Sequence, residues 1–260
     1  MVSAKEKLIV ALDFDNADRG IELFKELHDA AGMFKVGMQL FTAAGPELVR
    51  KIVSHGGRVF LDLKYHDIPN TVALAGIEAT RLGVSIFNIH ASGGKEMMKR
   101  TVQAVGETAQ RENLTKPKVI GVTVLTSVDR QTLQQIGIDE EAQSVVSRLA
   151  MLSQECGLDG VVASAREIKT IRNAVSQSGF LIVTPGMRSA SEAADDQRRT
   201  MSVGDAIRAG ADYVVVGRPI LAAPDPVAAA RQIVDEITVA LGEQVKAGDF
   251  TEQRRAQSVY

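Results

Sequence analysis

The chain has 260 residues, of which 45% are hydrophobic and 24% are charged, a balance that is typical of one globular domain with a sizeable core. Its net charge of −2 gives no reason to expect a nucleic acid or an anionic membrane as a partner. Cys156 is the only cysteine, which excludes an intrachain disulfide and suits the reducing cytoplasm. The apolar run Leu8–Leu12 is too short for a signal-peptide core or a membrane span, so we expect a cytoplasmic protein.

Short apolar runs rich in Val, Ile and Phe alternate along the chain with longer amphipathic stretches. The apolar runs are predicted strands: Leu8–Asp13, Met33–Gly37, Arg58–Lys64, Ser85–His90, Lys118–Val124, Asp159–Ala163, Phe180–Thr184 and Asp212–Gly217. The amphipathic stretches are predicted helices: Ala17–Ala30, Thr42–Ser54, Asn70–Leu82, Lys95–Glu112, Glu140–Glu155, Ala165–Gln177, Val203–Ala209 and Pro226–Leu241.

This alternation predicts an α/β fold. Buried strands separated by helices indicate parallel units, and eight of each is the number found in a (β/α)8 TIM barrel. A doubly wound open sheet is built from the same alternation and stays an alternative. The turn after the first strand, Asp13-Phe14-Asp15-Asn16, lacks the glycine-rich dinucleotide fingerprint, which favours the barrel.

The domain organisation follows from the absence of any linker, low-complexity block or repeat. We predict a single barrel domain over residues 1–242, followed by a polar tail over residues 243–260 that is expected to be mobile. Two loops, Ser127–Asp139 and Gly186–Met201, are long. Because long loops in compact domains are often functional, these two are candidates for a lid or a binding loop.

Charged residues stand at the ends of the first three predicted strands. Asp13 ends the first strand, Lys35 lies within the second, Asp62 and Lys64 end the third, and Asp67 follows just beyond. Barrel enzymes form their active sites at the carboxyl ends of the strands, so these residues are candidate catalytic groups.

The alternation of side chains along a strand places Asp62 and Lys64 on one face together with Phe60. Leu61 and Leu63 point the other way, toward the helices. Buried charges are costly unless they are paired, so we expect a compact cluster of alternating charge inside one end of the barrel. A structural ion-pair network is the alternative explanation for any one of these residues, but the whole set on adjacent strands favours a functional site.

A second group of residues suits phosphate binding. Thr184-Pro185-Gly186-Met187-Arg188 follows the seventh predicted strand, and Gly217-Arg218-Pro219 follows the eighth. Barrels frequently bind phosphate with the loops after these two strands. Glycine lets backbone N–H groups approach the anion and arginine offers two donors at once, so this is the expected phosphate side of the site.

Zinc chemistry is not expected from the four histidines, His28, His55, His66 and His90. They form neither an HExxH pair nor a cluster with the cysteine. Most are expected to be surface or structural residues, with His66 supporting its loop. The Gly-x-Ser-x-Gly nucleophile elbow and the phosphate-binding P-loop are also absent from the sequence.

The segment Phe60–Thr71, which reads FLDLKYHDIPNT, closely resembles the signature of the orotidine 5'-phosphate decarboxylase family in its bacterial form. Its Asp-x-Lys-x-x-Asp core also occurs in related barrel lyases that act on sugar phosphates, so the longer string carries the specificity. The resemblance extends over nearly the whole chain, through Ala11–Asp13, Phe34–Gly37, Val122–Ser127, Thr184–Arg188, Asp196–Arg199 and Val216–Pro219.

The resemblance implies a homodimeric TIM-barrel enzyme that converts orotidine 5'-phosphate to UMP and CO2 in de novo pyrimidine biosynthesis, without metal or cofactor. It implies that Lys64 protonates C6 of the product. Lys35, Asp62 and Asp67 then complete the charged network, with Asp67 coming from the other subunit of the dimer.

The same resemblance assigns the expected substrate contacts. The ribose ligands are Asp13 and Thr71, and the residues near the pyrimidine are Thr126, Ser127 and Pro185. The phosphate ligands are Arg188, Gln197, Gly217 and Arg218.

Two other functions stay open from the residues alone. The first is a metal-dependent sugar-phosphate lyase or aldolase on the same barrel, which would need further metal ligands. The string continues Ile68-Pro69-Asn70-Thr71, which offers no carboxylate for that purpose. The second is a non-catalytic sensor of a phosphorylated ligand, which has no need for two lysines and two carboxylates around one point.

Overall fold

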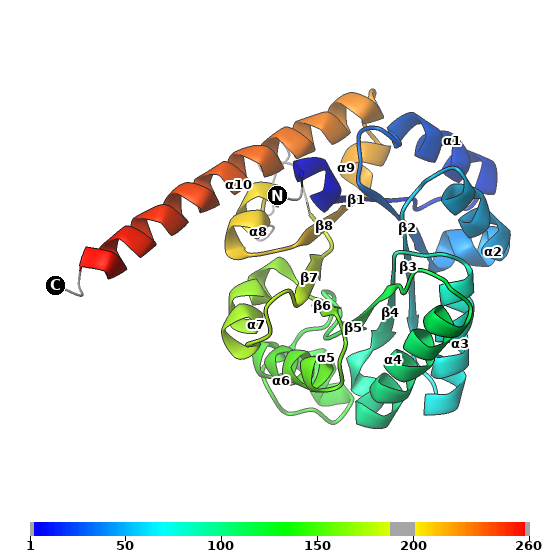
Figure 1. The fold of residues 1–260 in the computed structure, drawn as a ribbon, viewed down its shortest axis with the longest axis horizontal. Helices are drawn as coiled ribbons and strands as arrows, with labels where there is room; N and C mark the ends of the chain where they lie inside the picture. Colours follow the sequence, from blue (N-terminus) through cyan, green and yellow to red (C-terminus); the bar gives the residue numbers. More distant parts are fainter. Residues whose placement is uncertain (1–2, 188–200, 258–260) are drawn as a thin grey trace.

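Eight parallel strands form a closed barrel in the order β1 to β8 (Figure 1). The computed structural model describes residues 3–187 and 201–257, and the side chains of residues 3–187 and 201–243. The strands are β1 (Leu8–Ala11), β2 (Met33–Gly37), β3 (Val59–Tyr65), β4 (Ile86–His90), β5 (Lys118–Val122), β6 (Gly160–Val162), β7 (Leu181–Thr184) and β8 (Tyr213–Val216). β1 pairs with β8 through Ile9 and Val215, which closes the sheet and confirms the barrel over the open sheet.

Helices surround the barrel and connect successive strands (Figure 1). They are α1 (Ala17–Leu27), α2 (Met38–Ser54), α3 (Pro69–Arg81), α4 (Gly94–Arg111), α5 (Arg130–Gln135), α6 (Ala142–Glu155), α7 (Ile168–Ala174), α8 (Val203–Ala209), α9 (Arg218–Leu221) and α10 (Pro226–Gln257). The described residues also contain the 3-10 turns η1 (Ala4–Lys7), η2 (Ala91–Gly93) and η3 (Ala165–Glu167).

Two short helices, α5 and α9, are absent from the sequence prediction. α5 lies inside the loop Ser127–Asp139 and begins after Asp129, whose side chain accepts a hydrogen bond from the Thr132 amide at 2.8 Å. α9 has four residues and begins at Arg218. Helices of one turn or two are too short to show an amphipathic period, so they left no pattern to find.

The strands divide the core into two layers. Inside the barrel, the apolar side chains pack on one another: Ile9, Ala11, Met33, Phe60, Ile86, Ile120, Val183 and Val215. The alternate residues pack outward against the helices, among them Val59 and Leu61 of β3. Phe60 therefore points inward and its neighbours point outward, as the alternation predicted.

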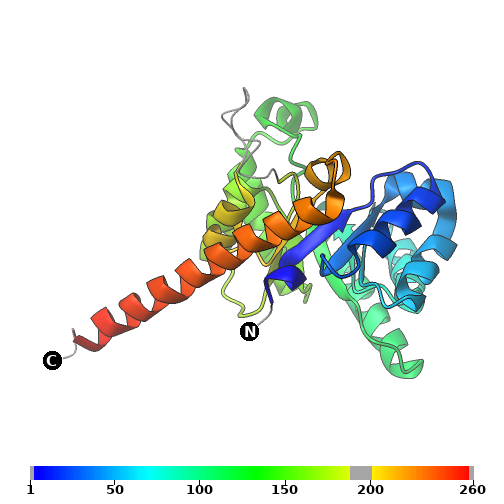
Figure 2. The ribbon, with the colours of Figure 1, turned by 90° about the horizontal axis from the view of Figure 1, so that it is seen from above.

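The last helix is much longer than predicted. α10 continues to Gln257 rather than ending at Leu241, and its far end projects away from the barrel (Figure 2). The segment after Gly242 contains no proline and is rich in Glu, Gln, Ala, Lys and Arg, which favour helix. Gly242 and Gly248 lie within α10. Each glycine costs about 1 kcal/mol relative to alanine in a helix, but the helix continues past both of them. In residues 3–187 and 201–257, no helix is both long and apolar enough to cross a membrane.

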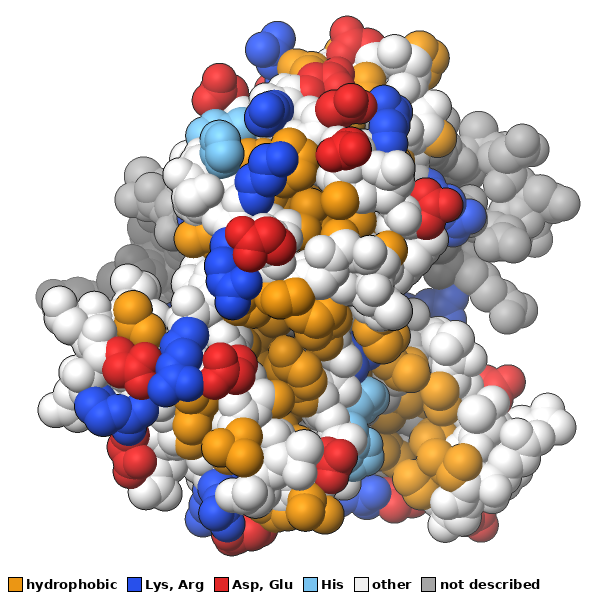
Figure 3. Space-filling model, turned by 90° about the vertical axis from the view of Figure 1, so that its right-hand side faces the viewer, with side chains coloured by type: hydrophobic (Ala, Val, Ile, Leu, Met, Phe, Trp, Pro, Cys, Tyr) orange, Lys and Arg blue, Asp and Glu red, His pale blue; other side chains and the backbone are white. Residues whose placement is uncertain are grey.

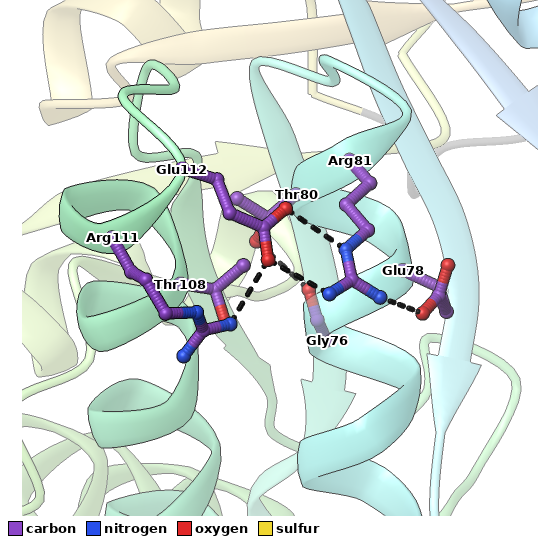
Figure 4. Close-up of polar contacts among 7 residues, drawn as sticks. All are labelled: Gly76, Glu78, Thr80, Arg81, Thr108, Arg111 and Glu112. Carbon is purple, nitrogen blue, oxygen red and sulfur yellow. Dashed lines mark hydrogen bonds and ion pairs between the residues drawn. The ribbon is translucent and has the colours of Figure 1, made fainter.

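A network of charged side chains joins the carboxyl ends of α3 and α4 (Figure 4). Arg81 donates two hydrogen bonds to Glu112, from Nε at 3.0 Å and from Nη2 at 2.7 Å, and a third to Glu78 at 2.6 Å. Arg111 donates to the same Glu112 carboxylate at 2.9 Å. Bonds from the two arginines hold the pKa of Glu112 at about 2. The network fixes the carboxyl end of α3 to α4. The other end of α3 follows directly after Asp67.

Candidate active site

Four of the predicted charged residues meet at the carboxyl ends of β1, β2 and β3. The Lys35 Nζ lies 2.9 Å from Asp13 Oδ1 and 3.6 Å from Asp62 Oδ2. The Lys64 Nζ lies 2.7 Å from Asp62 Oδ1. The four side chains therefore alternate in charge, in the order Asp13, Lys35, Asp62, Lys64, and we call them the charged cluster.

Asp62 is the centre of the charged cluster, and its side chain is only 13% exposed. Burial alone would raise its pKa, but the ammonium groups of Lys35 and Lys64 and the hydrogen bonds from Lys64 and Asn88 outweigh that effect. The pKa of Asp62 is therefore lowered, and the carboxylate is ionised at neutral pH.

Gly37 makes room for the charged cluster at the end of β2. A Cβ at this position would lie 2.8 Å from the Lys35 Nζ and 3.7 Å from Asp13 Oδ1. Any larger residue would therefore push the ammonium group away from its two carboxylates. The Phe34–Gly37 segment thus supplies the Lys35 ammonium group and, at Gly37, the space in which that group lies.

Asn88 belongs to the same site, and the sequence analysis missed it. It lies on β4 with its side chain inside the barrel, and it donates a hydrogen bond to Asp62 Oδ1 at 2.7 Å. The sequence does indicate such a role, because Asn88 is a single amide within the apolar run of β4. A buried amide needs hydrogen-bond partners.

A cavity of about 560 Å³ extends from the charged cluster to the loops after β7 and β8. Pro185, Gly186, Gly217 and Arg218 line it together with Asp13, Lys35 and Asp62. Arg218 places a guanidinium at this cavity, a group that can donate two hydrogen bonds to an anion. Arg188 and Gln197, the other predicted phosphate ligands, lie outside the described residues.

A smaller and more apolar cavity, of about 240 Å³, adjoins the first one at the charged cluster. Lys64, Thr126 and Ser127 line it, together with Val122, Val162 and other apolar side chains. Lys35, Asp62 and Pro185 border both cavities. The cluster therefore lies where a mostly apolar cavity meets a second cavity that Arg218 lines.

Asp67 and Thr71 stand apart from the charged cluster in this single chain. Both are exposed, and neither lines the two cavities. The Asp67 carboxylate accepts a hydrogen bond from the Ile68 amide at 2.6 Å. Within the described part of the chain, it has no ion-pair partner.

Two histidines lie next to the charged cluster. The rings of His66 and His90 are 5.3 Å apart, and the pKa of His90 is lowered by burial and by the nearby His66 and Lys64. Across residues 3–187 and 201–243, no group of three or more His, Cys, Asp or Glu side chains is placed to hold a metal ion.

Known proteins resemble this chain over most of its length. The family model described as "Orotidine 5'-phosphate decarboxylase / HUMPS family" matches residues 6–233. The orotidine 5'-phosphate decarboxylase of Moorella thermoacetica is 54% identical over 235 residues, which is 90% of this chain and 93% of that protein. The enzyme of the same name from Syntrophotalea carbinolica is 51% identical over 243 residues, 94% of this chain and 99% of its own.

Solved structures show the same likeness. The crystal structure of orotidine 5'-phosphate decarboxylase from Lactobacillus acidophilus superimposes with a TM-score of 0.78 at 34% identity, covering 88% of this chain and 98% of that one. The one from Pyrococcus horikoshii gives 0.70 at 28% identity, covering 89% and 99%. The chain therefore belongs to the orotidine 5'-phosphate decarboxylase / HUMPS family.

Proposed function

We propose that this chain decarboxylates orotidine 5'-phosphate to UMP and CO2, and that Lys64 protonates the product. The observation that carries the proposal is the position of Asp62 between Lys35 and Lys64, where an apolar cavity meets a cavity that Arg218 lines. The names and the 51–54% identity of the relatives support the same reaction.

The chemistry requires stabilisation of a carbanion. When the bond between C6 and the carboxylate breaks, CO2 leaves and the electron pair stays on C6, in the plane of the ring. No neighbouring carbonyl can delocalise it simply, so the protein must stabilise it electrostatically. The Lys64 ammonium borders the apolar cavity and is suited to do so, and then to transfer one proton to C6. Water restores the proton to Lys64 afterwards.

The carboxylates of the charged cluster position the two lysines. Asp62 holds Lys64 at 2.7 Å, while Lys35 lies between Asp13 and Asp62. In the proposal, Asp67 of a second subunit completes this network. An oriented ammonium group stabilises developing charge more than a mobile one does, because no reorganisation is needed when the bond breaks.

The phosphate supplies binding energy at a distance from the reacting carbon. We assign Gly217 and Arg218 to the phosphate, with Arg188 and Gln197 from the loop Gly186–Met201. Enzymes reduce barriers by about 8–23 kcal/mol, and a single lysine cannot supply the upper part of that range. Binding energy from the phosphate must therefore help to close the site and exclude water.

The remaining contacts are assigned to the nucleoside. Asp13 borders the larger cavity and is proposed to bind the ribose, together with Thr71. Thr126 and Ser127 line the smaller cavity and Pro185 borders both, which supports their assignment to the pyrimidine ring. No metal and no cofactor take part in this proposal.

A homodimer with shared active sites is part of the proposal. Ile68, just before α3, is 67% exposed, and Leu74, in the middle of α3, is 54% exposed. A hollow of about 660 Å³ lies between α3 and α4. Figure 3 shows hydrophobic side chains gathered across the face of the molecule on which these helices lie. Exposed apolar surface of this kind marks protein interfaces. A second copy bound here would cover Asp67 and Thr71.

A cytoplasmic location completes the proposal. It rests on the single cysteine, Cys156, which is buried and free. A chain without disulfides has no need of an oxidising compartment.

The experiment that tests the function is the ultraviolet absorbance of orotidine 5'-phosphate mixed with the protein, with and without a chelator. We expect the substrate spectrum to change to that of UMP at the same rate in both samples. Loss of activity in the chelator that magnesium restores would favour the metal-dependent lyase. A protein that binds UMP without changing the substrate spectrum would be a sensor.

A further inference from the structure

The pairing of β3 with β4 is irregular beside the charged cluster. Leu61 pairs with Phe87 and Tyr65 pairs with Ile89, so three residues of β3 lie opposite a single residue of β4. The three are Asp62, Leu63 and Lys64, and the single residue is Asn88. We call these three residues the excursion in β3. Like a β-bulge, extra residues of this kind bend the strand and leave backbone groups without hydrogen-bond partners in the sheet.

Lys64 has an unusual backbone within this excursion. Its φ is 53°, in the left-handed region that residues with a Cβ rarely adopt. Among the described residues, Asn113 is the only other residue besides glycine with a positive φ. Such a conformation persists where the surroundings impose it, and it is common at functional sites.

The Asn88 side chain supplies a hydrogen-bond partner for the Lys64 amide, which the irregular pairing of the two strands leaves without one in the sheet. It is fully buried, with 0% of its surface exposed. Its Oδ1 accepts a hydrogen bond from the Lys64 amide at 2.8 Å, and its Nδ2 donates to Asp62 Oδ1 at 2.7 Å. The same Asp62 oxygen accepts from the Lys64 ammonium at 2.7 Å. One amide group therefore holds both the backbone of Lys64 and the carboxylate that orients its side chain.

We propose that Asn88 is a positioning residue for the decarboxylation, because it holds Lys64 in the left-handed conformation that points its ammonium group at Asp62. The proposal rests on the proposed function of Lys64. Asn88 lines neither of the two cavities, so it acts through Lys64 and Asp62 rather than on the substrate. The role needs one acceptor and one donor at fixed positions, which an amide provides and an ionised carboxylate or an alkyl group does not.

Two substitutions separate positioning from simple packing. Asn88→Leu keeps much of the volume and removes both hydrogen bonds. Asn88→Asp keeps the shape and the acceptor but loses the donor while the new carboxyl is ionised. When that carboxyl is protonated, it again offers an acceptor and a donor. Thr101→Val is the matched control, because Thr101 is also fully buried and its hydroxyl donates a hydrogen bond to the Met97 carbonyl on α4, away from the site.

The test measures kcat and KM for orotidine 5'-phosphate, the Kd for UMP and thermal unfolding of the wild type and the three variants between pH 5.5 and pH 8. We expect Asn88→Leu to lose at least tenfold in kcat with the Kd for UMP within threefold. The kcat of Asn88→Asp relative to wild type should rise as the pH falls, because two adjacent carboxyls share a proton. Thr101→Val should keep the wild-type kcat.

The outcomes distinguish the two proposals. A folded Asn88→Leu with kcat within threefold of wild type would overturn the positioning role and leave the reaction standing. If Asn88→Leu does not fold, the pH dependence of Asn88→Asp decides, and a constant ratio to wild type overturns the role. A wild-type protein that does not decarboxylate orotidine 5'-phosphate would instead overturn the proposed function.

Discussion

Each ammonium group of the charged cluster is held by a carboxylate within 3 Å, and Asp62 contacts both lysines. Such an arrangement is costly to bury, because the ions lose their hydration and regain it only through good geometry. A structural ion pair could be replaced by apolar residues with little loss of stability. A pair retained beside two cavities is better explained by chemistry that needs the charge.

Lys64→Ala should abolish decarboxylation in a folded protein, because the proposal leaves C6 without its proton donor and its main electrostatic support. Lys118→Ala is the matched control. Lys118 is also a strand lysine paired with an aspartate, Asp159, at 2.9 Å, but it begins β5 at the opposite end of the barrel. Steady-state kinetics decide: a Lys64→Ala rate within tenfold of wild type, about 1.4 kcal/mol, would refute the assignment.

The lowered pKa of Asp62 predicts a pH-dependent contribution to stability. The folded-state pKa lies below 3.8, the ordinary value that applies to the unfolded chain. Ionised Asp62 therefore stabilises the fold above about pH 4, and this contribution falls as the pH drops through the folded-state pKa. The difference in the free energy of unfolding between wild type and Asp62→Asn should shrink from pH 5 toward about pH 3. Urea unfolding at each pH measures it, and a constant or growing difference would contradict the prediction.

Arg218→Ala should weaken the binding of UMP at least tenfold, about 1.4 kcal/mol, and leave the binding of uridine unchanged. The reason is that hydrogen bonds to a charged phosphate contribute about 1.5–3 kcal/mol. Uridine has no phosphate and therefore makes no such bonds to Arg218. Arg50→Ala, an exposed arginine on α2 bonded to Glu47, serves as the control. Equal Kd values for UMP in Arg218→Ala and wild type, measured by calorimetry, would mean that the phosphate binds elsewhere.

The elements of the barrel were largely predictable, because each strand is a short apolar run between amphipathic helices. β2 and α8 have the predicted bounds, while β1 ends at Ala11 rather than Asp13. Hydrophobicity marks where a strand is buried, but the strand ends where its ladder of hydrogen bonds ends. Those bonds depend on the neighbouring strand, which is distant in the sequence.

The charged cluster was predictable from the same pattern, since strand ends gather at one end of a barrel. The excursion in β3 was not, because it depends on the register between β3 and β4. Asn88 and the left-handed Lys64 follow from that register. The alternation of side chains along β3 alone cannot show that three of its residues lie opposite a single residue of β4.

Close packing of β6 against β7 gives a test of the barrel's construction. A Cβ at Gly160 would lie 2.6 Å from the Leu181 Cβ and would also collide with the Leu181 carbonyl oxygen. Gly160→Ala should therefore reduce the free energy of unfolding by about 1–3 kcal/mol. Gly106→Ala is the paired control, since nothing lies within 4 Å of its Cβ position on α4. It should raise stability by about 0.5–1 kcal/mol. Equal effects in thermal unfolding would contradict this packing.

In the proposed function, the active site of one chain is completed by a residue of a second chain. Lys64 lies inside its own barrel, whereas Asp67 is exposed beyond the end of β3 and beside the apolar surface at the start of α3. The network of Figure 4 joins the carboxyl ends of α3 and α4, at the other end of α3 from Asp67. We propose that a second copy receives Asp67 at this surface.

The central claim is a decarboxylase site in which Lys64 of one chain works with Asp67 of another, and mixing two inactive variants tests it most directly. Lys64→Ala and Asp67→Ala are each expected to be nearly inactive. In a mixed dimer, one site takes Lys64 from the Asp67→Ala chain and Asp67 from the Lys64→Ala chain, so it is intact. The other site carries both defects.

Random exchange makes half of the dimers mixed, and one of the two sites in each mixed dimer is intact. About a quarter of all sites should therefore be active, so the total rate should recover to about a quarter of that of the same amount of wild-type protein. Each variant exchanged with itself is the control and should stay inactive. If both residues came from one chain, every site would keep a defect. No recovery after proven subunit exchange would therefore contradict the shared site.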